Sequence, residues 1–115
     1  MKFISARTHG VLDYVTVIGF ALAPSVLGLD GLPKWICYAL AAIHLLLTLL
    51  TNFPLGAAKR IPFTLHGLIE LLVSIALVFL PWVLGFADQT MARYFFVAAG
   101  GTIFVVWALT EYSKK

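Results

Sequence analysis

The stretch HGVLDYVTVIGFALAPSVLGL, residues 9–29, decides the fold because the chain contains a second version of it. At an offset of 57 residues it aligns without a gap with HGLIELLVSIALVFLPWVLGF, residues 66–86. Seven of the 21 aligned positions are identical. Apolar sequence matches by chance at leucine, but not readily at the His, Gly, Pro and acidic positions that pair here: His9/His66, Gly10/Gly67, Asp13/Glu70, Pro24/Pro81 and Gly28/Gly85.

The repeat sets the organisation of the whole chain. The segments LTNF (50–53) and LTEY (109–112) also correspond, so each copy holds two helices, in repeats of about 8–57 and 62–115. An even number of helices keeps both copies in the same orientation, related by an axis near the membrane normal. We therefore predict an all-α integral membrane protein of four transmembrane helices, built as two tandem, parallel two-helix hairpin repeats in a single domain, 1–115.

Composition supports a membrane fold. Of the 115 residues, 62% are hydrophobic and only 11% are charged, against about a quarter charged in a soluble domain. Four runs carry no charge, at 14–29, 35–51, 71–87 and 94–110, and each nears the 17 to 25 or so residues that cross a bilayer. The predicted helices are 8–29, 33–52, 62–87 and 90–112, with Thr8 and Thr64 as N-caps.

Charge predicts orientation and argues against one partner class. One side collects the basic residues Lys2, Arg7, Lys59, Arg60, Lys114 and Lys115, and the other only Lys34 and Arg93. The positive-inside rule then predicts a multi-pass protein of a prokaryotic inner (plasma) membrane with both termini cytoplasmic. The net charge of +3 forms no stripe, so we expect the lipid bilayer as surroundings and no nucleic acid.

The string LPWVLGF, residues 80–86, resembles the signature of the SPW-repeat membrane proteins. That family is similar to this chain in plan, with a two-helix repeat that carries a Ser-Pro-Trp motif in its first helix. The likeness is carried by Pro81, Trp82, Leu84 and Gly85, while Leu80 stands in the place of the serine. The resemblance implies a fold and no established activity.

The residues that carry chemistry are two His-x-x-x-acid pairs, His9 with Asp13 and His66 with Glu70. Residues four apart share a helix face, and the repeat axis brings both pairs toward the bundle interior. Such a set suits a metal ion or a proton relay. The structural alternative is that each histidine offsets the burial of its own carboxylate near a helix end.

His44 lies deeper, on one face with Thr48 and Thr51. We interpret this face either as a polar track leading to the His-acid pairs or as hydrogen-bonding between helices. Pro24 and Pro81 predict helix kinks, which serve as fixed bends or as hinges. Gly100 and Gly101 predict close packing of the fourth helix, on its own chain or on a second copy.

From these features we expect a small structural or accessory membrane subunit without catalysis or cofactor. It is expected to form a homo-oligomer or to bind a membrane-protein partner. The alternatives are a proton or small-ion transporter or channel that uses the five-residue set, and a metal- or haem-binding membrane protein. The candidate residues for these activities are His9, Asp13, His44, His66 and Glu70.

Overall fold

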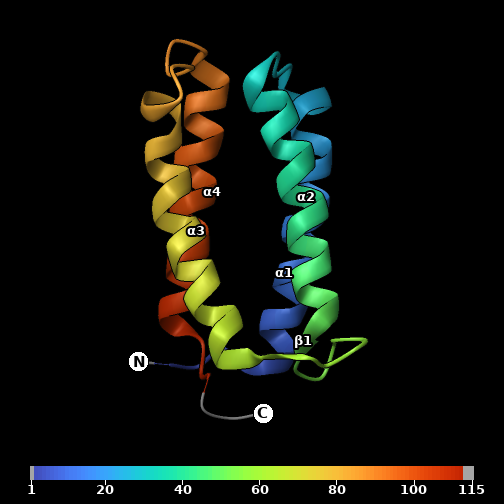
Figure 1. Cartoon of the computed structure of the whole chain (residues 1–115). Coiled ribbons are helices and arrows are strands. Elements are labelled where there is room, and N and C mark those ends of the chain that lie inside the picture. Colours follow the sequence, from blue (N-terminus) through green and yellow to red (C-terminus); the bar gives the residue numbers. More distant parts are fainter. Residues whose placement is uncertain (1, 113–115) are drawn as a thin grey trace.

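The computed structural model describes residues 2–112 and is all-helical apart from short strand pairings at one end. Figure 1 shows two helical hairpins standing side by side, with both ends of the chain at the same end of the molecule. The first hairpin is α1 (Ala6–Leu27) with α2 (Leu32–Leu50), and the second is α3 (Phe63–Val83) with α4 (Thr90–Leu109). Lys114 and Lys115, two of the basic residues counted above, lie outside the described residues.

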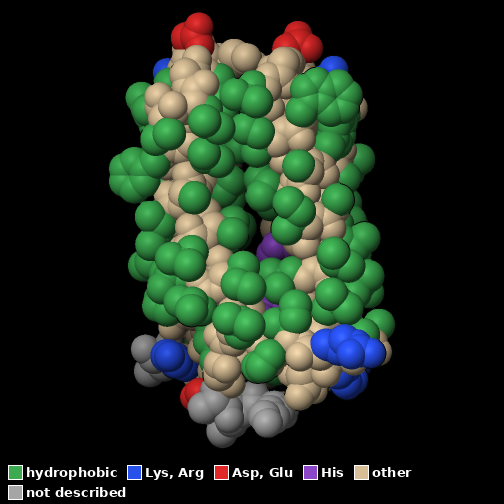
Figure 2. Space-filling model, in the orientation of Figure 1, with side chains coloured by type: hydrophobic (Ala, Val, Ile, Leu, Met, Phe, Trp, Pro, Cys, Tyr) green, Lys and Arg blue, Asp and Glu red, His purple; other side chains and the backbone are tan. Residues whose placement is uncertain are grey.

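All four helices are long and apolar enough to cross a membrane. They contain 19 to 22 residues, which at 1.5 Å each gives roughly 29–33 Å, the thickness of a hydrocarbon core. Figure 2 shows hydrophobic side chains over the middle of the molecule and charged side chains at its two ends. An exposed apolar surface of this extent needs a lipid-like solvent.

The helix starts differ from the predicted ones in a physically simple way. Thr8 is not the N-cap of α1, because the Ser5 side chain accepts a hydrogen bond from the Thr8 amide and starts the helix earlier. Thr64 is also not a cap, since Pro62 precedes α3 with no side-chain cap. Pro33 lies in the first turn of α2, where a missing amide hydrogen costs little.

The late prolines sit inside their helices. Pro24 and Pro81 lie in the last turns of α1 and α3, and each carbonyl accepts the amide of the residue five positions later. Gly28 and Gly85, which follow, both have positive φ, at 67° and 79°, as a glycine that ends a helix often does. The two kinks stay a prediction.

Each hairpin is held by close packing of its own two helices, while the hairpins touch each other much less. A Cβ on Gly100 would lie 2.7 Å from the Ser74 carbonyl oxygen, so α4 approaches α3 through this glycine. A Cβ on Gly101 would meet nothing within 4 Å. Of the two predicted packing glycines, Gly100 packs within the chain and Gly101 does not.

The two hairpins are joined at the end where the chain begins and ends. Strand β1 (Thr51–Asn52) pairs in parallel with β2 (Ile61–Pro62), with Thr51 opposite Ile61. Ile4 pairs in the same sense with Thr110. In both pairings the segment after the second helix of one hairpin contacts the segment before the first helix of the other.

We predict that Gly100→Ala lowers the free energy of unfolding by about 1–3 kcal/mol, because the added methyl group would overlap a backbone oxygen that cannot move alone. Gly101→Ala is the matched control and should stay within about 0.5 kcal/mol of the wild type. Thermal unfolding in mild detergent, followed by circular dichroism, measures both. A Gly100→Ala protein as stable as the wild type would contradict this packing.

Candidate functional site

Five polar side chains converge in the interior near the end that carries the chain termini. His9 and Asp13 come from α1, His44 from α2, and His66 and Glu70 from α3. All are buried, with His9 and His66 fully inaccessible. The structure thus brings together every residue of the two His-acid pairs and places His44 beside their carboxylates.

The two carboxylates bridge the imidazoles of both hairpins. His9 Nε2 lies 3.2 Å from Asp13 Oδ1 and 2.8 Å from Glu70 Oε1. His66 Nε2 lies 3.0 Å from Asp13 Oδ2 and 2.8 Å from Glu70 Oε2. His44 Nε2 approaches from the side, 3.3 Å from Asp13 Oδ1 and 3.4 Å from Glu70 Oε2. The two hairpins are therefore in direct contact through these side chains.

Two threonines hold the outer nitrogens of the imidazoles, and they do so across the hairpins. His9 Nδ1 is 2.8 Å from Thr110 Oγ1, at the end of the second hairpin. His66 Nδ1 is 2.6 Å from Thr51 Oγ1, at the end of the first. Each histidine is thus positioned by the other hairpin.

These threonines also fix the direction of each hydrogen bond. Thr51 donates its hydroxyl hydrogen to the Leu47 carbonyl and Thr110 donates its own to the Val106 carbonyl, both at 2.6 Å. A hydroxyl has one hydrogen, so each oxygen must accept from the imidazole, which places a hydrogen on Nδ1. In a neutral ring Nε2 then carries a lone pair, and both lone pairs face the carboxylates.

Lone pairs and carboxylate oxygens at these distances repel unless a positive species lies between them, which is either the hydrogen of an imidazolium Nε2 or a bound cation. His9 Nε2 and Asp13 Oδ2 make no hydrogen bond of good geometry among residues 2–112, although they lie 2.8 Å from Glu70 Oε1 and 3.0 Å from His66 Nε2. One donor atom from each of His9, Asp13, His66 and Glu70 lies within 4.8 Å of the others. The arrangement suits a cation held at the centre of these side chains. His9, Asp13, His44, His66 and Glu70 are called the cation cluster below.

Glycine and aromatic side chains cover the cation cluster. A Cβ on Gly67 would lie 2.7 Å from the Tyr112 ring, and one on Gly10 would lie 3.0 Å from the Phe53 ring. The Tyr112 and Phe53 rings in turn contact His9 and His66, with centroids 5.6 and 5.7 Å apart. The glycine after each histidine therefore admits the ring that shields the cation cluster from solvent.

Burial affects Tyr112 itself. Desolvation raises the pKa of its phenol, and the Glu70 and Asp13 carboxylates add to the effect, so the hydroxyl keeps its hydrogen. The covering ring therefore brings no further negative charge to the cation cluster.

The third histidine, His44, has no histidine at the corresponding position of the second hairpin. The offset of 59 that pairs Thr51 with Thr110 pairs His44 with Ile103. The His44 imidazole thus contacts the Asp13 and Glu70 carboxylates from α2, whereas the corresponding residue of α4 is the apolar Ile103. A small cavity of about 20 Å³ remains there, lined by Asp13, Glu70 and Ile103 among others.

Thr51 was predicted to lie on a polar track with His44, and Thr110 was not predicted to belong to the site. Thr51 instead orients His66, and Thr48 donates to the His44 carbonyl. The correspondence of LTNF and LTEY was the signal that places both threonines at equivalent positions. Which histidine each threonine contacts depends on how the two hairpins pack against each other.

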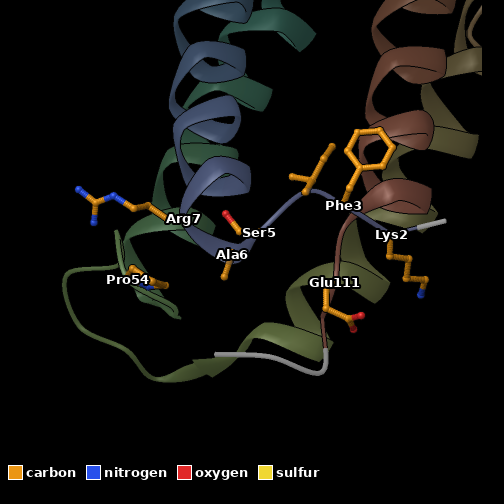
Figure 3. Close-up of a pocket in the computed structure, with 8 residues that line it drawn as sticks. Lys2, Phe3, Ser5, Ala6, Arg7, Pro54 and Glu111 are labelled. Atoms are coloured by element: carbon orange, nitrogen blue, oxygen red, sulfur yellow. The ribbon is translucent and has the colours of Figure 1, made fainter.

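A separate cavity of about 420 Å³ lies where the chain enters α1. Figure 3 shows Lys2 and Glu111 on one side of it and Arg7 on the other. None of the five clustered residues lines it. Its side chains of both signs define no preferred ligand charge.

Comparisons with models of protein families, with curated proteins and with solved structures find no match to this chain.

We predict that Asp13→Asn and Glu70→Gln have coupled effects on stability, because both carboxylates contact the same histidines. The double variant should depart from additivity by more than about 0.5 kcal/mol. Asp13→Asn combined with Asp88→Asn is the control, since Asp88 is exposed, and its effects should add. Thermal unfolding of the single and double variants measures both cycles, and additive effects for Asp13 with Glu70 would rule out a shared site.

Proposed function

We propose that the protein is a small membrane subunit that holds one divalent transition-metal ion between its two hairpins. The observation that supports this most is the pair of Thr51 and Thr110 hydrogen bonds, which turn the His66 and His9 Nε2 lone pairs toward two buried carboxylates. Histidine ligands of metals commonly donate their other ring N–H to a neighbouring acceptor in this way.

The spacing of the donor atoms fits an ion of this class. Bonds of about 2.0–2.1 Å to nitrogen and oxygen at tetrahedral angles separate neighbouring ligand atoms by roughly 3.3 Å. The nitrogen–oxygen distances among His9, Asp13, His66 and Glu70 run from 2.8 to 3.2 Å. All four donor atoms lie within 4.8 Å of one another, so small side-chain shifts would place them around one ion. Imidazole with carboxylate is a ligand set for zinc, iron or manganese.

Charge balance supports a divalent ion over a larger group. Two carboxylates with neutral histidines carry two negative charges, and one divalent cation cancels them inside an apolar bundle. A haem is a poor fit, because a porphyrin would need the space that the carboxylates occupy beside His9 and His66. The proton-relay alternative uses the same five residues and stays a prediction, tested by proton flux in liposomes.

The finer membrane assignments are part of the same proposal. We infer that the hairpins are copies of one SPW-repeat type unit, supported by the equivalent roles of Thr51 and Thr110 and by the positive φ of Gly28 and Gly85. The chain would act as an accessory subunit in a prokaryotic inner membrane. A homo-oligomer or a membrane-protein partner is expected, and crosslinking in bilayers at native expression level tests it.

Our first prediction here is that protein purified in mild detergent and loaded with Zn²⁺ or Mn²⁺ retains one ion per chain, measured by elemental analysis after desalting. Thr51→Val and Thr110→Val should each weaken the metal affinity about 10- to 100-fold, as loss of an outer hydrogen-bond partner does. Thr90→Val is the matched control, since Thr90 is exposed at the far end of α4 from the cation cluster, and its metal affinity should be unchanged.

Metal binding should also raise the unfolding temperature of the wild type, because an ion that binds only the folded state stabilises it. The outcome that overturns the proposal is a wild type that holds no metal and whose unfolding temperature is the same with Zn²⁺, Mn²⁺ or a chelator.

A second prediction concerns orientation. The excess of basic residues beside the chain termini predicts that both termini are cytoplasmic. Green fluorescent protein fused to the C-terminus should therefore fluoresce, and alkaline phosphatase fused there should be inactive. An active phosphatase at this position would reverse the assignment.

A further inference from the structure

A cavity of about 390 Å³ lies beside the start of α3, at the end of the molecule that carries the chain termini. Figure 2 shows Lys and Arg side chains at this end. Both charged residues that line the cavity are basic, and no acidic residue among 2–112 lines it. The lining includes Asn52, Lys59, Arg60, Phe63, Thr64 and Tyr112. Its charge therefore favours an anion, and its volume is within the range of small-molecule sites.

Backbone hydrogen bonds hold the basic pair in place. The amides of residues 57 and 58 donate to the Leu49 carbonyl, at 2.7 and 2.9 Å. The Arg60 amide donates to the Leu50 carbonyl, at 2.7 Å. Lys59 has a φ of 53°, in the left-handed region that residues with a side chain rarely adopt. The segment that carries Lys59 and Arg60 is thus tied to the end of α2, and the cavity is formed before any ligand binds.

Two aromatic rings separate this cavity from the cation cluster. The Phe63 and Tyr112 rings lie 4.7 Å apart between centroids. Each also contacts the His9 ring, with centroids 5.4 and 5.6 Å apart. None of the five cluster residues lines the cavity. A ligand bound here would therefore leave the cation cluster untouched.

The 420 Å³ cavity at the start of α1 provides a comparison within the same chain. At an offset of 57, Lys59 corresponds to Lys2, and at an offset of 59, Asn52 corresponds to Glu111. Lys2 and Glu111 line the cavity at α1. An acidic residue thus lines that cavity where a neutral amide lines the one at α3. Of the two, the cavity at α3 is the one lined by basic residues without an acid.

The position of the cavity favours a lipid over a free ion. Because α3 is long and apolar enough to cross a membrane, its start lies where lipid headgroups meet the hydrocarbon core. Thr64 lines the cavity, and Leu68 and Leu72 follow it by four and eight residues, on nearly the same helix face. These leucines are 51% and 60% exposed. A phosphate in the cavity would therefore have apolar surface beside it for an acyl chain.

We infer that this cavity binds the phosphate group of an anionic phospholipid between Lys59 and Arg60, with an acyl chain along Leu68 and Leu72. Basic pockets at this depth of a membrane protein suit anionic headgroups. A zwitterionic lipid is disfavoured, because its own ammonium group would lie beside two cations. The inference concerns a ligand other than the metal ion and does not depend on the proposed function.

The test measures binding of dioctanoyl-phosphatidylglycerol to the full chain in mild detergent, by native mass spectrometry. We expect it to bind at least about fivefold more tightly than dioctanoyl-phosphatidylcholine, which has the same chains and phosphate but an added ammonium group. Arg60→Gln should weaken binding about fivefold, and Asn52→Glu by at least as much, because it gives this cavity an acid. Lys2→Gln is the matched control, since it removes one basic residue from the other cavity at the same end, and should leave binding unchanged.

Lys59→Gly separates binding from folding. Glycine adopts a φ of 53° without steric cost, so this variant should unfold at the wild-type temperature or above it. It should nevertheless bind phosphatidylglycerol about fivefold more weakly, because one basic residue of the cavity is lost.

Three results would overturn the inference. Equal binding of the two lipids would show that the cavity does not select a negative charge. An equal loss of binding in Lys2→Gln and Arg60→Gln would show a general effect of surface charge. Displacement of phosphatidylglycerol by inorganic phosphate at the concentration of the lipid itself would assign the cavity to a soluble phosphate. Metal content measured on the same samples reports on the proposed function separately, since none of these variants changes a residue of the cation cluster.

Discussion

The burial of two carboxylates inside an apolar bundle is the constraint on which the rest of this structure depends. Asp13 and Glu70 are each less than a twentieth exposed, and an uncompensated charge in such surroundings would prevent folding. Three histidines surround them, and two threonines hold the His9 and His66 rings in place. The aromatic cover, the glycines that admit it and the paired strands at this end all serve to complete that compensation.

The same constraint explains why the two hairpins contact each other closely at the end that holds the chain termini and much less along the rest of their length. Near the chain termini the hairpins share hydrogen bonds, strand pairs and the cation cluster. Farther along, hydrophobic packing within each hairpin needs no partner across the axis, because lipid is as good a solvent for leucine as another helix is. Figure 2 shows a hollow between the hairpins with histidine side chains visible at its lower part.

The sequence predicted the number of helices, their ends to within a few residues, and the convergence of His9, Asp13, His66 and Glu70. These features follow from composition and from helical spacing, which are local. The roles of Thr51 and Thr110 were not predictable in the same way, because each bonds a histidine of the other hairpin. The predicted caps were wrong for local reasons: Ser5 caps α1 one turn before its expected start at Thr8, and α3 begins directly after Pro62 without a side-chain cap.

The crossed threonine bonds carry an implication for how such a chain arises. Each hairpin supplies the histidine that the other one orients, which is the exchange of parts seen in a swapped dimer. Two identical hairpins would close the same centre as separate polypeptides, but every change would then occur twice. Joining them through the segment between Phe53 and Arg60 lets the two hairpins carry different residues at corresponding positions, as Asp13 and Glu70 do and as His44 and Ile103 do. The covalent connection is thus what permits two hairpins of similar build to surround the carboxylates with a third histidine from one side alone.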